Sequence, residues 1–135
     1  MALKIGSVEW VKAYEDALNN NPAYKEAAKT WEGDFVFVIT PDGNLDHEIR
    51  FWMDLWHGDC RASKSLKEGE EQEAEYVVTG TYSNYIQVIN KEVGPVKALM
   101  MGKLKLQGKM AKVLRAVEAA KQLVATIGNI DTEFY

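Results

Sequence analysis

The residues best suited to acid–base or metal chemistry are two histidines, at the two ends of one predicted strand. His47 and His57 are the only histidines in the chain. A strand of that length separates its ends by roughly 33 Å, at ~3.3 Å per residue, so the two imidazoles cannot share a metal ion. Asp46, Glu48 and Asp59 flank them, but polar residues gather at strand and turn ends in any case. We therefore expect no metal site.

Cys60 is the single cysteine and the other candidate for chemistry. A nucleophilic cysteine needs a base within reach, and a tight turn directs the nearby His57 away from it. We expect a packed, inert thiol. The chain has no Gly-x-Ser-x-Gly elbow, no Gly-rich phosphate loop and no Gly-x-Gly-x-x-Gly motif. Because no catalytic group is indicated, we expect a protein that is not an enzyme and that uses no cofactor.

Length and composition indicate one globular domain over residues 1–135. The chain is 47% hydrophobic and 27% charged, which is close to the globular average. No apolar run approaches the ~18–20 residues of a membrane span, and the charged N-terminus does not resemble a secretory signal. A single cysteine excludes an intramolecular disulfide. We expect a cytoplasmic protein, and its net charge of -4 argues against nucleic acid as the main partner.

Charge is unevenly distributed along the chain. Residues 97–121 hold seven basic side chains and one acidic side chain, a local charge of +6. Residues 1–96 hold nine basic and 17 acidic side chains, a charge of -8. Two interpretations stay open: a solvated helix face, or a basic rim that receives an anionic head group through Lys103, Lys109 and Arg115.

Hydrophobic periodicity predicts an α+β domain with one five-stranded, mainly antiparallel sheet covered by helices. Helices are predicted over residues 8–20, 22–31, 81–91 and 109–127, with a short helical turn at 96–101. Strands are predicted over residues 34–40, 47–56, 60–66, 74–79 and 103–107. The first strand is apolar on both faces, which is typical of a central strand. In the second strand, Phe51 and Met53 alternate with Trp52 and Trp56, so the tryptophans should lie on the opposite face.

Large apolar residues are plentiful in the sheet and in the later helices. Three of the five methionines fall between Met100 and Met110, and methionine suits surfaces that repack around variable apolar ligands. Periodicity does not distinguish a packed core from a ligand cavity.

The segment from Met100 to Met110, MMGKLKLQGKM, resembles the signature of the sterol carrier protein 2 (SCP-2) family. Phe51-Trp52-Met53-Asp54-Leu55 followed by His57-Gly58 resembles the second strand and hairpin of that family, and Glu75 to Thr79 resembles its fourth strand. The resemblance covers residues 23–124. Lys109 departs from the Asn or Asp usual before Met110. Residues 128–135 form a C-terminal extension beyond the usual end and contain no peroxisomal Ser-Lys-Leu signal.

The resemblance implies a five-stranded sheet with helices on one side and a hydrophobic tunnel between the two layers. It implies binding or transfer of a fatty acid, an acyl-CoA or a sterol-like lipid without catalysis, with at most transient membrane contact. The sequence does not specify which lipid. Carried onto this chain, the tunnel residues are Phe35, Phe37, Phe51, Met53, Leu99, Met100, Met101, Met110, Val113, Leu114 and Val117.

Two alternatives remain at this stage. The first is a homodimeric interaction module that uses the face bearing Trp52 and Trp56, because exposed tryptophans mark interfaces. Ile130, Phe134 and Tyr135 could then cover these tryptophans or be exchanged between subunits, and we expect the tail to do one or the other. The second alternative is a small hydrolase or isomerase that uses the same pocket.

Overall fold

The five predicted strands form one sheet in the computed structural model, which describes residues 1–135. The spatial order is β4-β3-β2-β5-β6, so β2 is central as its apolar faces predicted. β2 and β5 are parallel, and the other neighbours are antiparallel. This confirms the predicted fold class. The strands are β2 (Glu32–Thr40), β3 (Ile49–Trp56), β4 (Asp59–Leu66), β5 (Tyr76–Thr81) and β6 (Lys105–Gln107).

The side-chain alternation of β3 separates the two faces of the sheet. Phe51, Met53 and Leu55 are buried, whereas Trp52 and Trp56 lie on the other face and keep some exposure. β3 turns into β4 through His57 and Gly58, which both have positive φ, as a tight hairpin turn requires. A side chain at position 58 would also collide with the backbone carbonyl of Lys25, so the turn needs glycine there.

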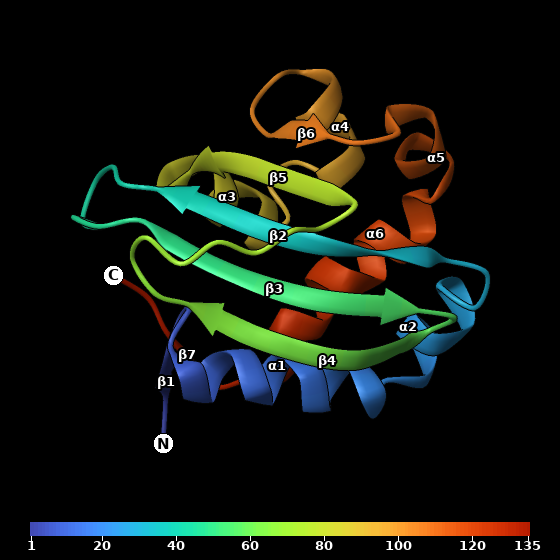
Figure 1. The fold of residues 1–135 in the computed structure, drawn as a ribbon, viewed down its shortest axis with the longest axis horizontal. Coiled ribbons are helices and arrows are strands. Elements are labelled where there is room, and N and C mark those ends of the chain that lie inside the picture. Colours follow the sequence, from blue (N-terminus) through green and yellow to red (C-terminus); the bar gives the residue numbers. More distant parts are fainter.

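The helices pack on one face of the sheet (Figure 1). This is the face that carries the buried Phe51, Met53 and Leu55, whereas Trp52 and Trp56 lie on the other. α2 ends at Ala27 rather than near Trp31, whose side chain is buried. No helix combines the length and the hydropathy that a membrane span requires. The helices are α1 (Val8–Asn19), α2 (Pro22–Ala27), α3 (Tyr82–Ile89), α4 (Pro95–Met100), α5 (Met110–Arg115) and α6 (Val117–Ala125), followed by the 3₁₀ turn η1 (Thr126–Asn129).

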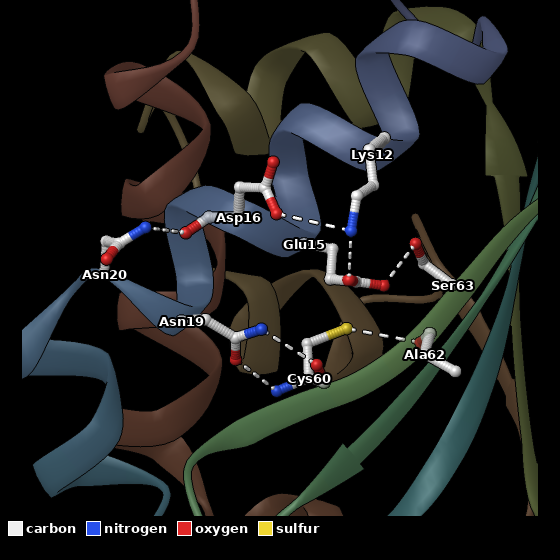
Figure 2. Close-up of polar contacts among 8 residues, drawn as sticks. All are labelled: Lys12, Glu15, Asp16, Asn19, Asn20, Cys60, Ala62 and Ser63. Atoms are coloured by element: carbon white, nitrogen blue, oxygen red, sulfur yellow. Dashed lines mark hydrogen bonds and ion pairs between the residues drawn. The ribbon is translucent and has the colours of Figure 1, made fainter.

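α1 lies against the edge strand β4 and satisfies part of its unpaired backbone (Figure 2). The Asn19 side chain donates to the carbonyl oxygen of Cys60 at 2.9 Å and accepts from the backbone N–H of Cys60 at 2.8 Å. The Ser63 hydroxyl donates to the Glu15 carboxylate at 2.8 Å. These bonds hold α1 on the sheet and cover an edge that would otherwise be open to pairing with another chain.

The last predicted helix, residues 109–127, is in fact two helices. The chain breaks at Ala116 (φ -97°, ψ 42°), between α5 and α6. Lys112 and Arg115 lie in the last turn of α5, and Glu118 lies in the first turn of α6. Cations favour a helix C-terminus and anions an N-terminus, so the charges fit the break. The apolar stripe runs through both helices, and for this reason it did not reveal the break.

The C-terminal tail does not cover the tryptophan face, so that expectation was wrong for the single chain. β7 (Thr132–Glu133) pairs in parallel with β1 (Leu3–Lys4) on the helical side of the molecule. The terminal Tyr135 exchanges hydrogen bonds with the Tyr82 hydroxyl. The backbone of Leu3 and Lys4 provides hydrogen-bond partners for the tail. Backbone hydrogen bonding leaves no mark in the pattern of apolar side chains, so the sequence of the tail did not predict this pairing.

The tryptophans are partly covered by neighbouring side chains of the sheet and of the turn between β3 and β4. Trp52 donates its indole N–H to the carboxylate of Asp34 at 2.8 Å. Trp56 stacks on His57 and lies under the guanidinium of Arg61, 4.5 Å from its ring centroid. The tryptophans therefore have polar and cationic neighbours within the same chain.

Candidate functional site

An apolar cavity lies between the sheet and the helices. Its volume is about 120 Å³ for the centres of water-sized spheres. Of the 24 residues that line it, 23 are hydrophobic. The sheet and all of the helices contribute residues to the wall, although the exposed C-terminal end of α4 does not. The cavity therefore exists only in the assembled fold.

The two walls of the cavity differ in side-chain size. Phe35, Phe37 and Phe51 form the sheet wall, with ring centroids 5.3 Å apart between the first two and 5.1 Å apart between the last two. The helical wall includes the small residues Ala116, Ala119 and Ala120 at the break and on α6. Because alanine fills little volume opposite the aromatic rings, a gap remains where a larger residue would complete the core.

The side-chain polar atoms of four lining aromatic residues, Trp10, Tyr14, Trp31 and Tyr85, are bonded to the protein itself. The hydroxyl of Tyr14 donates to the carbonyl of Leu123 at 2.7 Å, and that of Tyr85 donates to the carbonyl of Val78 at 2.8 Å. The indole N–H of Trp10 donates to the Thr132 hydroxyl at 2.9 Å. These groups are already paired, so the cavity wall presents apolar surface rather than free hydrogen-bonding groups.

Burial keeps the tyrosines of the cavity neutral. It raises the pKa of Tyr14, Tyr24 and Tyr85 well above the ordinary value for tyrosine. A phenolate in this apolar setting would lose its hydration without compensation. No lining residue therefore carries charge at neutral pH.

Five of the predicted tunnel residues line the cavity, and six do not. Those that line it are Phe35, Phe37, Phe51, Leu99 and Val113. Met53 is fully buried but packs within the core beside the cavity. The remaining five lie outside its wall: Met100, Met101, Met110, Leu114 and Val117.

The outlying residues are displaced by the local ends of short helices. α4 ends at Met100, so Met100 and Met101 lie at its C-terminal end, and their exposed fractions are 73% and 56%. Met110 and Val117 open α5 and α6 on either side of the break, and both are exposed. A continuous helix would have directed the whole stripe inward, but the break at Ala116 rotates part of it away.

The three predicted head-group residues lie outside the apolar wall. Lys103 is half-buried and donates to the side-chain oxygen of Gln87 at 3.0 Å. Lys109 and Arg115 flank α5, are exposed and form no ion pair. Of the three, only the two on α5 are free to meet an anionic group.

Several cavity residues were not identified from the sequence. They come mainly from α1, α2, α3 and α6: Trp10, Tyr14, Tyr24, Trp31, Tyr85, Val88, Ile89, Ala119, Ala120 and Leu123. The helical stripes containing Tyr14 and Tyr85 marked inward faces. Ala119 and Ala120 were the only residues whose small size could have indicated unfilled space. Alanine is so common in helices that its presence does not predict a cavity.

The residues first considered for chemistry lie apart from the cavity. His47 contacts Asp46 and Tyr135, whereas His57 contacts Glu32 at the other end of β3. The chain places no three His, Cys, Asp or Glu side chains where they could hold a metal ion. Burial raises the pKa of the Cys60 thiol to about 12, with the charge of Glu15 acting in the same direction. The thiol is therefore packed and protonated, as predicted.

Comparison with known proteins gives a family with the same architecture. A crystal structure of a sterol carrier protein 2 matches with a TM-score of 0.84 and 32% identity, over 94% of this chain and 99% of that one. A conserved hypothetical protein from Thermus thermophilus matches with a TM-score of 0.85 and 30% identity, over 98% and 93% of the two chains.

A more distant match is the sterol carrier protein 2 of Aedes aegypti, solved in complex with palmitate. Its TM-score is 0.54 at 16% identity, over 92% of this chain and 98% of that one. No curated protein sequence matches the chain. The family model of the SCP-2 sterol transfer family matches residues 11–121, which include most of the cavity wall. The chain belongs to the SCP-2 sterol transfer family.

Proposed function

We propose that this protein binds and transfers a lipid in the cavity, without chemical conversion of the ligand. The observation that carries the proposal is the chemistry of the wall: 23 of 24 lining residues are hydrophobic, and the polar atoms of Tyr14, Tyr85 and Trp10 are already bonded within the chain. Such a wall holds a hydrocarbon chain and offers no group for catalysis. The palmitate bound by the mosquito family member supports this ligand class.

The energy of chain burial is sufficient for useful affinity. Burying ~14 methylenes at ~0.8 kcal/mol each contributes on the order of 11 kcal/mol before opposing terms. Immobilising a flexible chain removes several kcal/mol of this, which leaves binding in the micromolar range or tighter.

The polar end of the ligand must remain at the mouth of the cavity. A carboxylate inside would lose its hydration with no partner, a cost of several kcal/mol. Lys109 and Arg115 are exposed at the two ends of α5, next to the lining residue Val113. We therefore favour fatty acids and acyl-CoA esters, whose charged ends would stay outside near these side chains.

A substitution that fills the cavity tests the proposal. Ala120→Phe adds a ring on the α6 wall, and we expect the affinity for a fluorescent fatty acid to fall by about five- to thirtyfold, since one or two kcal/mol of chain burial is displaced. Ala111→Phe is the matched control, because Ala111 is exposed on α5 and does not line the cavity. Circular dichroism confirms that both variants are folded. Unchanged binding by folded Ala120→Phe would overturn the assignment of the cavity as the ligand site.

A further inference from the structure

We propose that the free edge of β6 binds an extended segment of a partner protein in which apolar and acidic residues alternate. β6 is the last strand of the sheet and pairs only with β5, at the edge near α4 and α5 (Figure 1). Its other side therefore presents an unpaired strand edge. The proposal goes beyond lipid binding and does not depend on it, because no residue of Lys105–Gln107 lines the cavity.

The outer edge of β6 has no hydrogen-bond partner within the chain. Apart from the ladder with β5, the backbone N–H and C=O groups of Lys105–Gln107 form no hydrogen bond. The opposite edge of the sheet differs, because the Asn19 side chain bonds both the N–H and the C=O of Cys60 on β4. A strand edge with free donors and acceptors is a template on which a further strand can pair.

The edge is held in place by the residues on either side of it. The backbone N–H of Lys103 donates to the carbonyl of Ala98 at 2.9 Å, and the Asn84 side chain donates to the carbonyl of Lys103 at 3.0 Å. Gly108 follows the strand with a φ of 128°, and a side chain there would collide with the ring of Tyr76. A strand fixed at both ends loses little conformational freedom when a partner pairs with it.

The two faces of β6 differ, and this difference sets the pattern of a partner strand. Leu106 packs against the core on the helical side, whereas Lys105 and Gln107 are exposed on the other face of the sheet. The residues of an added strand would alternate in the same way, with acidic side chains on the face of Lys105. Its apolar side chains would lie on the helical side, where three methionines at the end of α4 and the start of α5 are exposed: Met100, Met101 and Met110.

Uncompensated positive charge around β6 favours an acidic partner. In residues 1–96, seven of the nine basic side chains form ion pairs with acids. Residues 97–121 carry a charge of +6, and five of their basic side chains are exposed and form neither an ion pair nor a side-chain hydrogen bond: Lys97, Lys105, Lys109, Arg115 and Lys121. Complementary charge of this kind selects a partner and accelerates its association.

A second copy of this chain fits the edge less well than an acidic segment does. Pairing of β6 with β6 would bring together Lys105 and Lys109 of both copies, with no acidic residue in the strand to compensate them. Lysine on an edge strand is a common protection against self-association for this reason. An acidic strand meets no such repulsion, so the same lysines that exclude a second copy attract it.

Protection of backbone amides tests the docking with a defined probe. The probe is a capped octapeptide in which valine and glutamate alternate, added to the full chain at neutral pH. At millimolar peptide, we expect hydrogen exchange at the outward-facing amides of Lys105–Gln107 to slow by at least about tenfold, because strand pairing protects an amide. Amides of β4 should exchange as before. Unchanged exchange in β6 would overturn the proposal.

Two control peptides separate strand pairing from simple charge attraction. An octapeptide in which valine and lysine alternate should bind at least about tenfold more weakly, because its charge has the wrong sign. The valine–glutamate peptide methylated on every backbone nitrogen keeps its charge but cannot donate hydrogen bonds, so it should leave the exchange of β6 unchanged. Equal protection by the methylated peptide, or equal binding of the lysine peptide, would contradict the proposal.

A charge reversal on the strand tests the edge itself. Lys105→Glu should lower the affinity for a fluorescently labelled valine–glutamate peptide by about tenfold, measured by fluorescence anisotropy. Lys67→Glu is the matched control, because Lys67 is also exposed and forms no ion pair, and it follows β4 at the opposite edge. Circular dichroism confirms that both variants are folded. Equal losses in the two variants would overturn the proposal.

The chain alone provides the test of a second copy as the occupant. Sedimentation velocity over a range of concentrations should show no dimer that depends on Lys105–Gln107, and the exchange of these amides should not change with protein concentration. Dimers that protect the same amides would show that a second copy occupies the edge, and the proposal of an acidic partner would then be wrong.

Discussion

Burial of a single thiol couples the stability of the fold to alkaline pH. Cys60 is buried, and no cationic side chain contributes to the shift of its pKa. Its thiol donates a weak hydrogen bond to the Ala62 carbonyl at 3.4 Å (Figure 2). Its pKa is raised to about 12 by burial first and by Glu15 second, whereas the unfolded chain would release the proton near 9. At pH values between these, the folded state holds a proton that the unfolded state has lost, so stability falls as pH rises.

We therefore predict that Cys60→Ala reduces the loss of stability between pH 9 and 10. In the unmodified protein this thiol lowers the free energy of unfolding by up to about 1.4 kcal/mol per pH unit above its unfolded pKa. Tyr14, Tyr24 and Tyr85 act in the same direction above pH 10, and both proteins share that contribution. Urea unfolding at pH 7, 9 and 10 measures the difference. Parallel pH profiles for the two proteins would contradict the assignment.

At the scale of elements, α5 is a short helix fixed to the sheet by one lysine. The Lys112 ammonium lies 4.7 Å from the ring centroid of Trp31 and donates to the carbonyl oxygen of Glu32. Val113, the next residue, lines the cavity. The cation–π contact contributes about 0.5–2 kcal/mol, which is substantial for a helix of six residues.

We predict that Lys112→Ala loosens α5 and speeds ligand exchange. The amides of α5 should exchange hydrogen faster by about tenfold, and the dissociation rate of a bound fluorescent fatty acid should increase, because local opening costs less. Lys121→Ala is the control, since Lys121 is exposed on α6 and does not contact the Trp31 ring. Equal exchange rates in α5 for the two variants would show that Lys112 does not hold the helix.

The paired strands β1 and β7 close the end of the molecule near Trp10. The buried indole of Trp10 donates to the Thr132 hydroxyl, so Thr132→Val leaves an unpaired N–H and should lower the free energy of unfolding by about 1–3 kcal/mol. Thr132→Ser retains the hydroxyl and should keep most of the stability. Thermal unfolding followed by tryptophan fluorescence distinguishes them. The assignment fails if Thr132→Ser and Thr132→Val lower the free energy of unfolding by the same amount.

At the scale of the whole molecule, charge separates into a basic end and an acidic remainder. If Lys109 and Arg115 receive the anionic end of a lipid, Lys109→Glu with Arg115→Glu should weaken the binding of an acyl-CoA by more than that of an uncharged lipid, by about 1 kcal/mol per residue at low salt. The difference should shrink as salt rises. Competition binding with both ligands measures this difference in affinity. Equal losses for the two ligands would contradict a head-group role and would indicate that Lys109 and Arg115 belong to a solvated helix face.

The sequence determined the sheet and the family. Alternation in β3 separated Phe51 and Met53 from Trp52 and Trp56, because neighbouring strand residues always point to opposite faces. The apolar character of both faces of β2 predicted its central place, and the segment from Met100 to Met110 carried the family resemblance. These features are local or periodic, so they can be read along the chain.

The tertiary structure alone decided where the cavity lies. Phe51 lines it while Met53 packs beside it, although both point inward from one strand. A cavity is a volume that side chains from many elements leave unfilled, and no single stretch of sequence records that sum. For the same reason, the pairing of Thr132–Glu133 with Leu3–Lys4 depends on partners distant in sequence. The break at Ala116 sets which apolar side chains of α5 and α6 face the cavity and which face the solvent.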